Sequence, residues 1–594
     1  MNEIAPNPSS ALIDPDDVTE TKPPASRRLI PMIGNYPDYA NPDLVEAIPL
    51  SARTILDVGC GGGAVGAAYR QRNPRARILG IESDPISGAR AAERLDAVQI
   101  GDVEATPMPF DLPDGLDCLI YGDALEHMRD PWSLLRSQAA SLNDDGAVVM
   151  CFPNVEHFSI VFRLLNGSFD YDPEGLLDRT HLRWFTPRMM ARAVSDAGLA
   201  LCDIRPRPTD PTGATRFVEA MRPALAALGV DPGDYLNRAA PVQFILRAKK
   251  APRPRLVVNA SMLPPIGGVS DVRVVEPIRA ISTDASVLAS IRTEPDFATL
   301  LPEAPHIAVL HRPLLLGDAG IGRVRSLIER GFLVVTEFDD HPVFMEKNGV
   351  PSDQLFTFTA THAIQTSTEP LAEALSAFNP EIAVFPNAIS ALSEPVNFTN
   401  PERMTLFFAA LNREEDWAPL MPALNEVLRA VGARLAVTVL HDQGFFDALD
   451  TPHKNFLPTT DYPSYQAALA RSEIFFMPLG DTLFNRAKSD LKFIEASAAR
   501  VVSLASPVVY ENSLIDGQTG LLFRSPDALR MQLLRLLAYP DAAQRMANAA
   551  RDYVARERML AYQTRARIDW YRSLWDRRDA LTEALRARMP RLFG

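Results

Sequence analysis

The chain has 594 residues, of which 47% are apolar and 23% are charged. This composition is typical of globular domains, and at about 150 residues per domain the length predicts roughly four folded units. It excludes a collagen, a coiled coil and a largely disordered chain. The formal charge of −14, from 60 basic and 74 acidic residues, excludes a general electrostatic attraction to nucleic acid or anionic lipid.

The cysteines and the terminal segment indicate the compartment. No two cysteines form a CxxC pair, which favours a reducing cytoplasm over a zinc or disulfide framework. The first residues carry acids and prolines where a secretory signal would be basic and then apolar, and no stretch reaches the roughly 18 apolar residues of a membrane span. We therefore expect a cytoplasmic, soluble protein.

The chain begins with a polar segment and continues into an α/β pattern. Residues 1–30 are rich in Pro, Ser and Asp, so we expect a disordered tail. Over 31–248, apolar strand-like runs alternate with helical patterns, which favours parallel βαβ units and a Rossmann-like domain. The predicted strands are 54–58, 76–82, 117–121, 147–152 and 242–248.

A glycine-rich loop follows the first predicted strand. Gly59, Gly61 and Gly63 lack side chains, so their backbone amides can approach a ligand closely. Gly59, Gly61 and Ala64 also satisfy the GxGxxA fingerprint of dinucleotide-binding domains, and Glu82 could accept hydrogen bonds from the ribose of either ligand. The loop alone leaves both ligands open.

Two acidic residues favour an adenosine sulfonium over a dinucleotide. A carboxylate at Asp57, at the mouth of the loop, would repel a pyrophosphate but suit the ammonium group of a methionyl moiety. Asp102 falls where a third strand should end and could accept from an adenine amino group. The alternative is that both residues merely cap neighbouring helices.

The motifs LDVGCGGG, GIESD, GDVE, ALEHMRDPW, FPNVEHF and GLLDRTHLRWFT resemble those of class I S-adenosylmethionine-dependent methyltransferases over about residues 35–248. The resemblance implies a seven-stranded sheet and S-adenosyl-L-methionine as methyl donor. It places the methionyl and ribose parts near the loop, the ribose hydroxyls on Glu82 and the adenine at Asp102 and Val103. The implied cofactor residues are Asp57, Gly59, Gly61, Gly63, Glu82, Asp102 and Val103.

Methyl transfer to a hydroxyl needs an aligned acceptor and a base. His127, just after the predicted strand 117–121, and His181 are the candidate catalytic residues. His127 could equally be a capping or packing histidine. The charged residues beside His181, namely Asp178, Arg179 and Arg183, could instead form an ion-pair network that closes a lid.

A basic, proline-containing segment, 249–255, is predicted to be a linker, after which two further α/β series follow. Residues 256–390 and 391–570 are predicted to form two doubly wound lobes, with 571–594 as a helical tail. The strands expected in the first lobe are 256–260, 306–311, 332–339, 362–367 and 382–388. Those expected in the second are 404–410, 434–440, 473–479 and 500–506.

An anion site is predicted in the second lobe. Ser489 could cap a helix beginning at Asp490, which would place Lys488 beside exposed amides at the positive helix end. Glu495, later on that helix, could accept from two ribose hydroxyls. The diglycine of Gly267 and Gly268 is a weaker signal for a ligand-facing loop in the first lobe.

The segments 484–523, 407–417 and 384–389 resemble GT-B glycosyltransferases of the group that includes sugar-nucleotide-dependent cell-surface polysaccharide enzymes, over about 255–570. The resemblance implies a nucleotide-diphosphate sugar as donor, with Arg413 and Lys488 on its diphosphate, Glu495 on its ribose and Asn387 at the hinge. Ala487 stands where this family often has a glutamate, and NREEDW lacks the usual lysine. These departures leave open a lobe that binds without catalysing.

Two further features have simple explanations. The acids of TEFDDHP, with His341, are those of an Asp-rich turn ending a strand, and no metal site is predicted. The arginine-rich terminal helix could contact a membrane, but its alternating acids favour packing or a bridge between lobes.

The sequence therefore predicts a bifunctional transferase. Methyl transfer and glycosyl transfer would act on a bacterial surface glycan or a lipid-linked oligosaccharide. A lipid-linked acceptor would allow peripheral contact with the inner face of the membrane, and no nucleic-acid partner is expected. There are two alternatives. One is a methyltransferase joined to a non-catalytic nucleotide-sugar module, and the other is a dinucleotide enzyme in the first domain.

Overall fold

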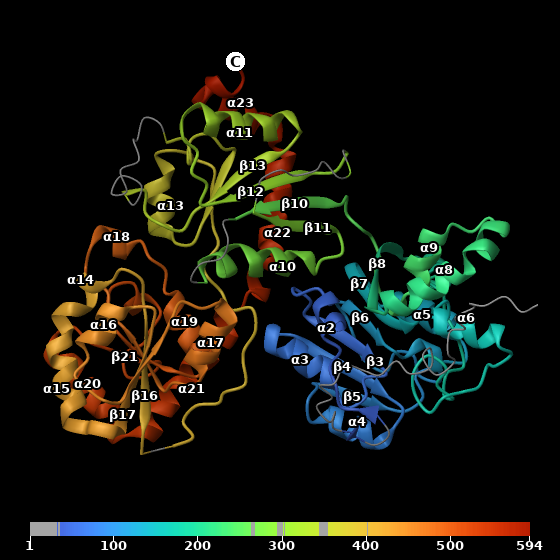
Figure 1. Ribbon diagram of the computed structural model, residues 1–594, viewed down its shortest axis with the longest axis horizontal. Coiled ribbons are helices and arrows are strands. Elements are labelled where there is room, and N and C mark those ends of the chain that lie inside the picture. The colour runs from blue at the N-terminus through green and yellow to red at the C-terminus, as the bar shows by residue number, and fades with distance from the viewer. Residues whose placement is uncertain are drawn as a thin grey trace, which may run out of the picture. The chain divides into compact units, whose positions relative to one another are not determined.

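A computed structural model describes residues 32–33, 36–262, 268–293, 301, 303–343, 355–400 and 402–594 (Figure 1). Gly267 and the predicted tail, 1–30, lie outside these residues. The chain divides into two compact units, the first drawn from 1–69 and 76–252 and the second from 70–75 and 253–594. The division at 252 falls within the segment predicted to be a linker, although Lys249 still belongs to a strand.

The first unit contains a seven-stranded sheet in the order β5-β4-β3-β6-β7-β9-β8. Neighbouring strands from β5 to β7 pair in parallel, whereas β9 runs antiparallel to both β7 and β8. A short antiparallel pair, β1 (Met32–Ile33) with β2 (Tyr36–Pro37), precedes it. The sheet strands are β3 (Thr54–Val58), β4 (Arg77–Glu82), β5 (Ala97–Ile100), β6 (Leu116–Gly122), β7 (Leu142–Pro153), β8 (Ala200–Thr209) and β9 (Pro241–Lys249).

Helices connect these strands, and several begin at an acidic or hydroxyl N-cap followed by proline, a combination that favours helix initiation. Both faces of the sheet are buried, which explains why its central strands are apolar throughout. The helices are α2 (Pro42–Ala47), α3 (Ala64–Arg72), α4 (Pro85–Ala92), η1 (Leu125–His127), α5 (Pro131–Ala139), α6 (Phe158–Leu165), α7 (Pro187–Asp196), α8 (Pro211–Ala227) and α9 (Pro232–Ala239).

The second unit contains two parallel six-stranded sheets, ordered β11-β10-β12-β13-β14-β15 and β18-β17-β16-β19-β20-β21. We call the parts around them the first and second lobes. The first sheet comprises β10 (Leu256–Ser261), β11 (Val287–Arg292), β12 (His306–His311), β13 (Leu333–Glu337), β14 (Ala363–Thr366) and β15 (Ile382–Val384). The second comprises β16 (Met404–Ala409), β17 (Leu435–Leu440), β18 (Lys454–Leu457), β19 (Ile474–Met477), β20 (Val502–Ala505) and β21 (Leu521–Leu522).

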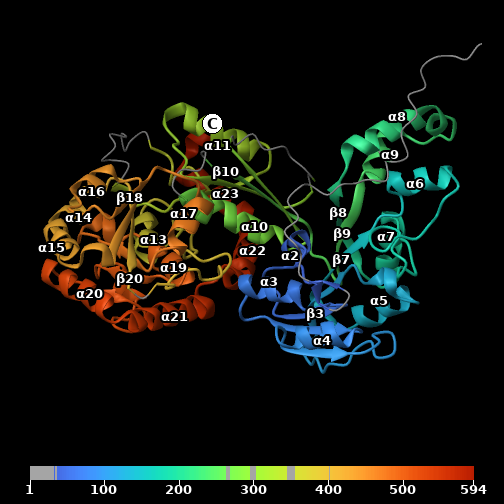
Figure 2. The ribbon, with the colours of Figure 1, turned by 60° about the horizontal axis from the view of Figure 1, so that its bottom comes forward.

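Helices pack on both sheets of this unit, as Figure 2 shows for the second lobe. Those up to the last strand are η2 (Asp271–Val275), α10 (Glu276–Ser282), α11 (Gly317–Glu329), α13 (Glu369–Ser376), α14 (Glu414–Trp417), η4 (Ala418–Leu420), α15 (Met421–Val431), η5 (Gly432–Arg434), α16 (Gln443–Ala448), α17 (Tyr462–Ala470), α18 (Leu483–Arg486), α19 (Leu491–Ala498) and η6 (Tyr510–Asn512). After it come α20 (Pro526–Ala538), α21 (Pro540–Glu557), α22 (Ala561–Asp576), α23 (Arg578–Arg588) and η7 (Pro590–Leu592).

The C-terminal helices return to the first lobe rather than forming the predicted tail at 571–594. Ile568, Tyr571 and Leu574 of α22 lie in one buried cluster with residues of β10, β12 and β13. Leu585 of α23 is buried in the neighbouring cluster. Figure 1 shows both helices, in red, against the strands of this lobe. The predicted boundary at 570 therefore divides α22, whose apolar side chains complete the core of the first lobe.

No helix in the part of the chain that the structure describes combines the length and the apolar character needed to cross a bilayer.

Candidate functional sites

The predicted glycine loop lies between β3 and α3 and takes a backbone conformation that favours glycine. Gly59, Gly61 and Gly63 have φ angles of 70°, 52° and 76°. A Cβ on Gly59 would lie 3.0 Å from the Cβ of Ala124, and one on Gly63 would lie 3.2 Å from the Cα of Ala91. Larger residues would therefore strain the backbone and also displace the segments beside the loop.

Glu82 is held beside this loop by backbone donors. Its Oε2 accepts a hydrogen bond from the Gly61 amide at 2.8 Å, and its Oε1 accepts from the Asp84 amide at 2.9 Å. The carboxylate is 5% exposed. These contacts fix Glu82 at the carboxyl end of β4, where the sequence predicts the ribose acceptor.

Asp57 is a buried residue of β3, close to the start of the loop. The side chain is 2% exposed, and its Oδ2 has no hydrogen-bond partner among the described residues. Burial, and secondarily the nearby Glu82, raise the pKa of Asp57 to about 7. A buried carboxylate with an unused oxygen is a receptor for a cationic group, because such a group would compensate its desolvation.

The two residues predicted at the adenine, Asp102 and Val103, differ in their exposure to solvent. Val103 is buried, whereas Asp102 is exposed and its carboxylate is already paired. Asp102 Oδ1 accepts from the Glu104 amide at 2.9 Å, and Oδ2 accepts from Arg129 at 2.6 Å. An adenine amino group would have to share this carboxylate with Arg129.

The two candidate bases, His127 and His181, lie side by side. Their ring centroids are 4.9 Å apart in an edge-to-face arrangement. His127 ends the turn η1 after β6, and the backbone oxygen of Glu126 in that turn accepts from the amides of Leu182 and Arg183, at 2.8 and 3.0 Å. This backbone clamp brings residues from two distant segments together.

Asp178 and Arg183, which were predicted to join an ion-pair network beside these histidines, bind other partners. Asp178 accepts hydrogen bonds from the amide and hydroxyl of Thr180, each at 2.7 Å. The Arg183 guanidinium donates to the backbone oxygens of Leu182 and Arg129. Asp178 therefore shapes its own turn, and Arg183 binds main-chain oxygens.

Sequence reasoning missed Glu126 as a member of this group. Its side chain is 1% exposed, and Oε2 lacks a hydrogen-bond partner within the described ranges. Burial, followed by the nearby Asp123, holds the pKa of Glu126 well above its usual range. The signal was present in the ALEHM motif, but a glutamate beside a histidine does not reveal that it is buried.

In the second unit, Lys488 and Arg413 follow two strands that are neighbours in the sheet, β19 and β16. Lys488 forms an ion pair with Asp340 of the first lobe. Arg413 donates to Asn485 Oδ1 at 2.7 Å and to Asp416 Oδ2 at 3.1 Å. Both predicted diphosphate ligands thus lie at the carboxyl ends of adjacent strands, with protein partners in place.

Ser489 does not cap the following helix. Helix α19 begins at Leu491 with Asp490 as its N-cap residue, and no side-chain capping bond occurs there within the described chain. Instead, Ser489 Oγ accepts from Asn387 Nδ2 at 2.7 Å. Asp490 pairs with Arg558 at 2.8 Å, and this ion pair explains why the aspartate takes the N-cap position without bonding to the helix amides.

Glu495 is buried and both its oxygens are occupied. Tyr462 and Tyr465 donate to Oε1 and Oε2 at 2.8 Å each. Burial raises the pKa of Glu495 to about 7, against the lowering effect of the two tyrosine hydrogen bonds. Gly268 of the first lobe packs against Tyr462, because a Cβ on Gly268 would lie 2.7 Å from that ring.

Lys492 is a basic residue of this region that sequence reasoning missed. Its ammonium group donates to the backbone oxygen of Ala409, the last residue of β16, at 2.7 Å. Burial, followed by the charge of Arg413, lowers the pKa of Lys492 to about 8. The signal was its position at the start of the helix that follows Lys488.

The acids of TEFDDHP are held by basic residues. Glu337 is fully buried and pairs with Arg273 at 2.8 Å, while Asp339 and Asp340 both pair with Arg312. The pKa of Asp339 is lowered to about 2, where the attraction of Arg312 outweighs the opposing effect of burial. These pairs account for the acidic run without a metal ion.

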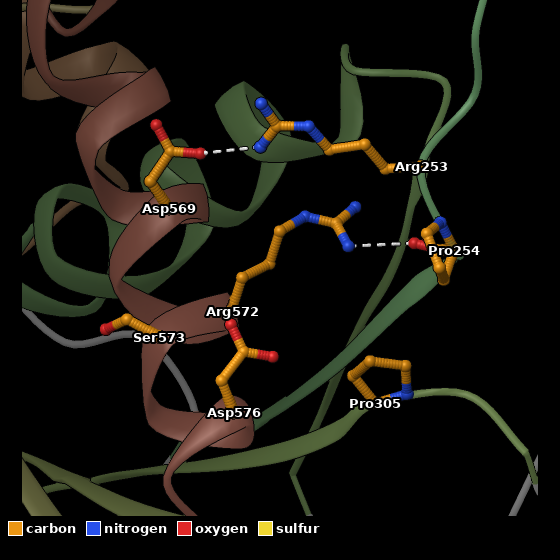
Figure 3. A pocket seen from close by; sticks show the side chains of 7 residues that line it. All are labelled: Arg253, Pro254, Pro305, Asp569, Arg572, Ser573 and Asp576. Atoms are coloured by element: carbon orange, nitrogen blue, oxygen red, sulfur yellow. Dashed lines mark hydrogen bonds and ion pairs between the residues drawn. The ribbon is translucent and has the colours of Figure 1, made fainter.

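A pocket of about 370 Å³ lies at the amino-terminal ends of the first-lobe strands. Pro254 and Pro305, which line it, precede β10 and β12. Figure 3 shows Arg253 directed at Asp569, and Arg572 at the carbonyl oxygen of Pro254, with distances of 3.1 and 2.8 Å. Open parallel sheets bind ligands at the carboxyl ends of their strands, so this pocket belongs to the packing of α22.

Comparison with known proteins bears on the first unit. A family model described as a methyltransferase domain matches residues 34–203. The ubiquinone biosynthesis O-methyltransferase of Stutzerimonas stutzeri is 27% identical over 163 residues, which span 27% of this chain and 69% of that protein. A protein of a Streptomyces fradiae transposon is 30% identical over 171 residues, or 28% of this chain and 48% of that one.

Two similar solved structures each cover part of this chain. A SAM-dependent methyltransferase from Archaeoglobus fulgidus covers 35% of this chain and 95% of its own, with 17% identity and a TM-score of 0.27. TarM covers 45% of this chain and 54% of its own, with 11% identity and a TM-score of 0.35.

The family match and the sheet order of the first unit agree with each other. The sheet places the glycine loop after β3 and the histidine turn after β6, on the two sides of the position where the strand order reverses. Residues 34–203 therefore lie in a class I S-adenosylmethionine-dependent methyltransferase domain.

Proposed function

We propose that the chain is a bifunctional transferase, in which the first unit methylates a hydroxyl group and the second transfers a sugar from a nucleotide-diphosphate donor. The observation that carries the proposal is shared by the two units. In each, polar ligand-binding candidates follow the two strands that flank a reversal of strand order, β3 and β6 in one sheet and β16 and β19 in the other. Ligands of open α/β sheets bind in the crevice at that position.

In the methyltransferase domain, the bound sulfonium would supply the leaving group, so the protein has to align the acceptor and remove its proton. We propose that Asp57 receives the ammonium of the methionyl group and that Glu82 accepts from the ribose. We propose His127 and His181 as the proton acceptors, because Gly59 packs against Ala124, which precedes the turn that carries His127, and His181 lies beside His127.

In the second unit, Lys488, Arg413 and Lys492 would stabilise the negative charge that develops on the departing diphosphate. Arg413 and Lys488 follow the strands at the reversal, and Lys492 binds the end of β16. Glu495 would accept from the ribose once Tyr462 or Tyr465 releases it. We propose a glycan or lipid-linked oligosaccharide as the shared acceptor, since tethering two enzymes raises the effective concentration of one product at the next site.

A second candidate, a methyltransferase with a nucleotide-sugar-binding module that does not catalyse, is favoured by particular contacts. Both oxygens of Glu495 are taken by tyrosines, Lys488 is paired with Asp340, and Ala487 replaces an expected carboxylate. Each of these lowers the number of groups free to act on a donor.

Calorimetry tests the methyl-donor site. We expect the full chain to bind S-adenosylhomocysteine and not NAD, and Asp57→Ala to weaken binding of the former by about tenfold, through loss of a charge-assisted contact. Asp114→Ala, an exposed position of the same unit, is the matched control. Unchanged affinity in Asp57→Ala would remove the ammonium contact from the proposal.

Donor hydrolysis tests the second unit. With a panel of nucleotide-diphosphate sugars, we expect slow release of free sugar, lowered at least about tenfold in Lys488→Ala and Glu495→Ala. Asp450→Ala, an exposed ion-pair partner of Arg429, should leave the rate unchanged. Binding of a nucleotide sugar without hydrolysis would favour the second candidate, and a rate equal in all variants would exclude this site.

A further inference from the structure

Three side chains capable of ligating a metal meet in the methyltransferase domain. One ligand atom from each of Glu126, His127 and His181 lies within 4.8 Å of the other two. The residues come from the turn η1 and from the segment before α7, which the Glu126 backbone oxygen clamps together through the amides of Leu182 and Arg183. The cluster is therefore held by the backbone and does not depend on its side chains alone.

Backbone oxygens orient both imidazole rings. His127 Nδ1 lies 3.2 Å from the oxygen of Thr180, and His181 Nδ1 lies 3.3 Å from the oxygen of Leu176. A carbonyl oxygen can only accept, so each Nδ1 carries the proton and each Nε2 of the neutral ring presents a lone pair. Metal-ligating histidines commonly donate their other nitrogen to a carbonyl in this way.

The third member, Glu126, provides a carboxyl oxygen without a hydrogen-bond partner in the described chain. Glu126 is 1% exposed, and its Oε2 has no hydrogen-bond partner among residues that the structure describes. The carboxylates of Asp123 and Asp178 interact electrostatically with Glu126 and with His127. No arginine or lysine ion pair with Glu126 is found in the described chain. An isolated buried carboxylate is costly, and a bound cation would remove that cost.

We propose that Glu126, His127 and His181 bind one divalent transition-metal ion. Two imidazoles and one carboxylate suit zinc, iron or manganese better than calcium or magnesium, which prefer oxygen ligands. Ligand atoms about 2.1 Å from a metal lie roughly 3 to 3.5 Å apart, so binding needs these atoms to approach by about 1 Å. Three protein ligands leave open positions on the metal, as in catalytic sites.

We assign the open coordination positions of the metal to the methyl acceptor, because the cluster lies beside the glycine loop. This assignment rests on the proposed function. The turn that carries Glu126 and His127 starts at Ala124, which contacts Gly59 of the cofactor loop. With the metal bound, both histidines act as ligands in place of their role as proton acceptors. A hydroxyl bound to the metal has a lowered pKa and loses its proton to water. The resulting oxygen would then form a bond to the methyl carbon as the carbon–sulfur bond breaks, which leaves S-adenosylhomocysteine.

Metal binding by the full chain tests the site without cofactor or acceptor, so its outcome is independent of the proposed reaction. After chelator treatment and dialysis, we expect one equivalent of Zn²⁺ to bind by calorimetry, and one equivalent of Co²⁺ to give visible absorption bands typical of nitrogen and oxygen ligation. Glu126→Gln, His127→Ala and His181→Ala should each lower the affinity by about 100-fold or more, since each removes a ligand.

His157→Asn is the matched control. His157 is the remaining histidine of this unit, and its side chain caps α6, a role that asparagine can fill. Glu126→Gln keeps the side-chain volume and removes an uncompensated buried charge, so the thermal midpoint of the metal-free variant should not fall. Failure of the chain to bind Zn²⁺ or Co²⁺ would overturn the proposal, as would equal binding in Glu126→Gln and the control.

Discussion

Asp57 is a buried acidic residue of the methyltransferase domain, and we propose that it receives a cationic group. Its strand neighbours Leu56 and Val58 are fully buried, so the carboxyl shares an apolar environment, and one oxygen has no partner in the described structure. The cost of ionising it is therefore high until a ligand supplies positive charge. The ionised Asp57 would therefore lower the stability of the ligand-free domain, and a bound cation would restore it.

Asp57→Asn should change how stability depends on pH. Between pH 4 and pH 7 the folded state holds a proton that the unfolded state has lost, because the folded pKa is about 7 and the usual value is 3.8. The free energy of unfolding therefore falls as pH rises through this window. The advantage of the Asn variant over the unmodified protein should grow by about 3 kcal/mol from pH 5 to pH 8.

Denaturant unfolding of the ligand-free protein at several pH values measures this difference. Asp114→Asn, at an exposed turn, should show no such pH-dependent gain. If the difference between Asp57→Asn and the unmodified chain is constant from pH 5 to pH 8, Asp57 does not ionise within that window.

At the level of elements, α22 stabilises a lobe from which it is distant in sequence. Tyr571 is fully buried, and its hydroxyl donates to Gln365 Oε1 of β14 at 2.7 Å. Ile568 and Leu574 lie one turn away on the same face and belong to the same cluster. The helix covers the sheet with an apolar stripe, beside which Arg567 is also buried.

Tyr571→Ala should lower the free energy of unfolding of the second unit by about 3 to 5 kcal/mol, because it opens a cavity in the core of the first lobe. Tyr571→Phe should cost only about 1 kcal/mol, the contribution of one hydrogen bond. Denaturant unfolding, with hydrogen exchange of β10 and β12, measures both. Glu583→Ala, on an exposed position of α23, should change stability by less than about 0.5 kcal/mol. Equal stability of all three variants would mean that α22 does not support the sheet.

On the scale of the whole second unit, ion pairs and hydrogen bonds connect the two lobes at the proposed donor site. Asp340 follows β13 in the first lobe and binds Lys488, which follows β19 in the second. The hinge residue Asn387 accepts from Arg273 at 2.8 Å and donates to Ser489. Because a donor diphosphate carries the same sign of charge as Asp340, the two would compete for Lys488.

Asp340→Asn should therefore increase the affinity for a nucleoside diphosphate by about fivefold, the value of one partly exposed ion pair of about 1 kcal/mol. Calorimetry with UDP and GDP measures it. Asp450→Asn, which removes an exposed ion pair with Arg429, should leave the affinity unchanged. Weaker or unchanged binding in Asp340→Asn would show that Asp340 does not compete with the ligand.

Much of the architecture could be predicted because its signals are local. Apolar runs bounded by loops correctly predicted the central strands of all three sheets, including β3, β12 and β16. The short edge strand β18 was missed, since a strand that packs on one side only carries little apolar pattern. The edge strand β5 was expected only as a strand that ends just before Asp102. The glycine loop was recognisable because its backbone conformation excludes other residues.

The sequence by itself determined the α/β class and the position of the glycine loop, which depend on neighbours a few positions away. Only the tertiary structure decided that Glu126 meets His181, that Asp340 meets Lys488 and that α22 completes the first lobe. Such contacts join segments tens to hundreds of residues apart. Their partners are selected by burial and charge in three dimensions, and local sequence patterns do not record that selection.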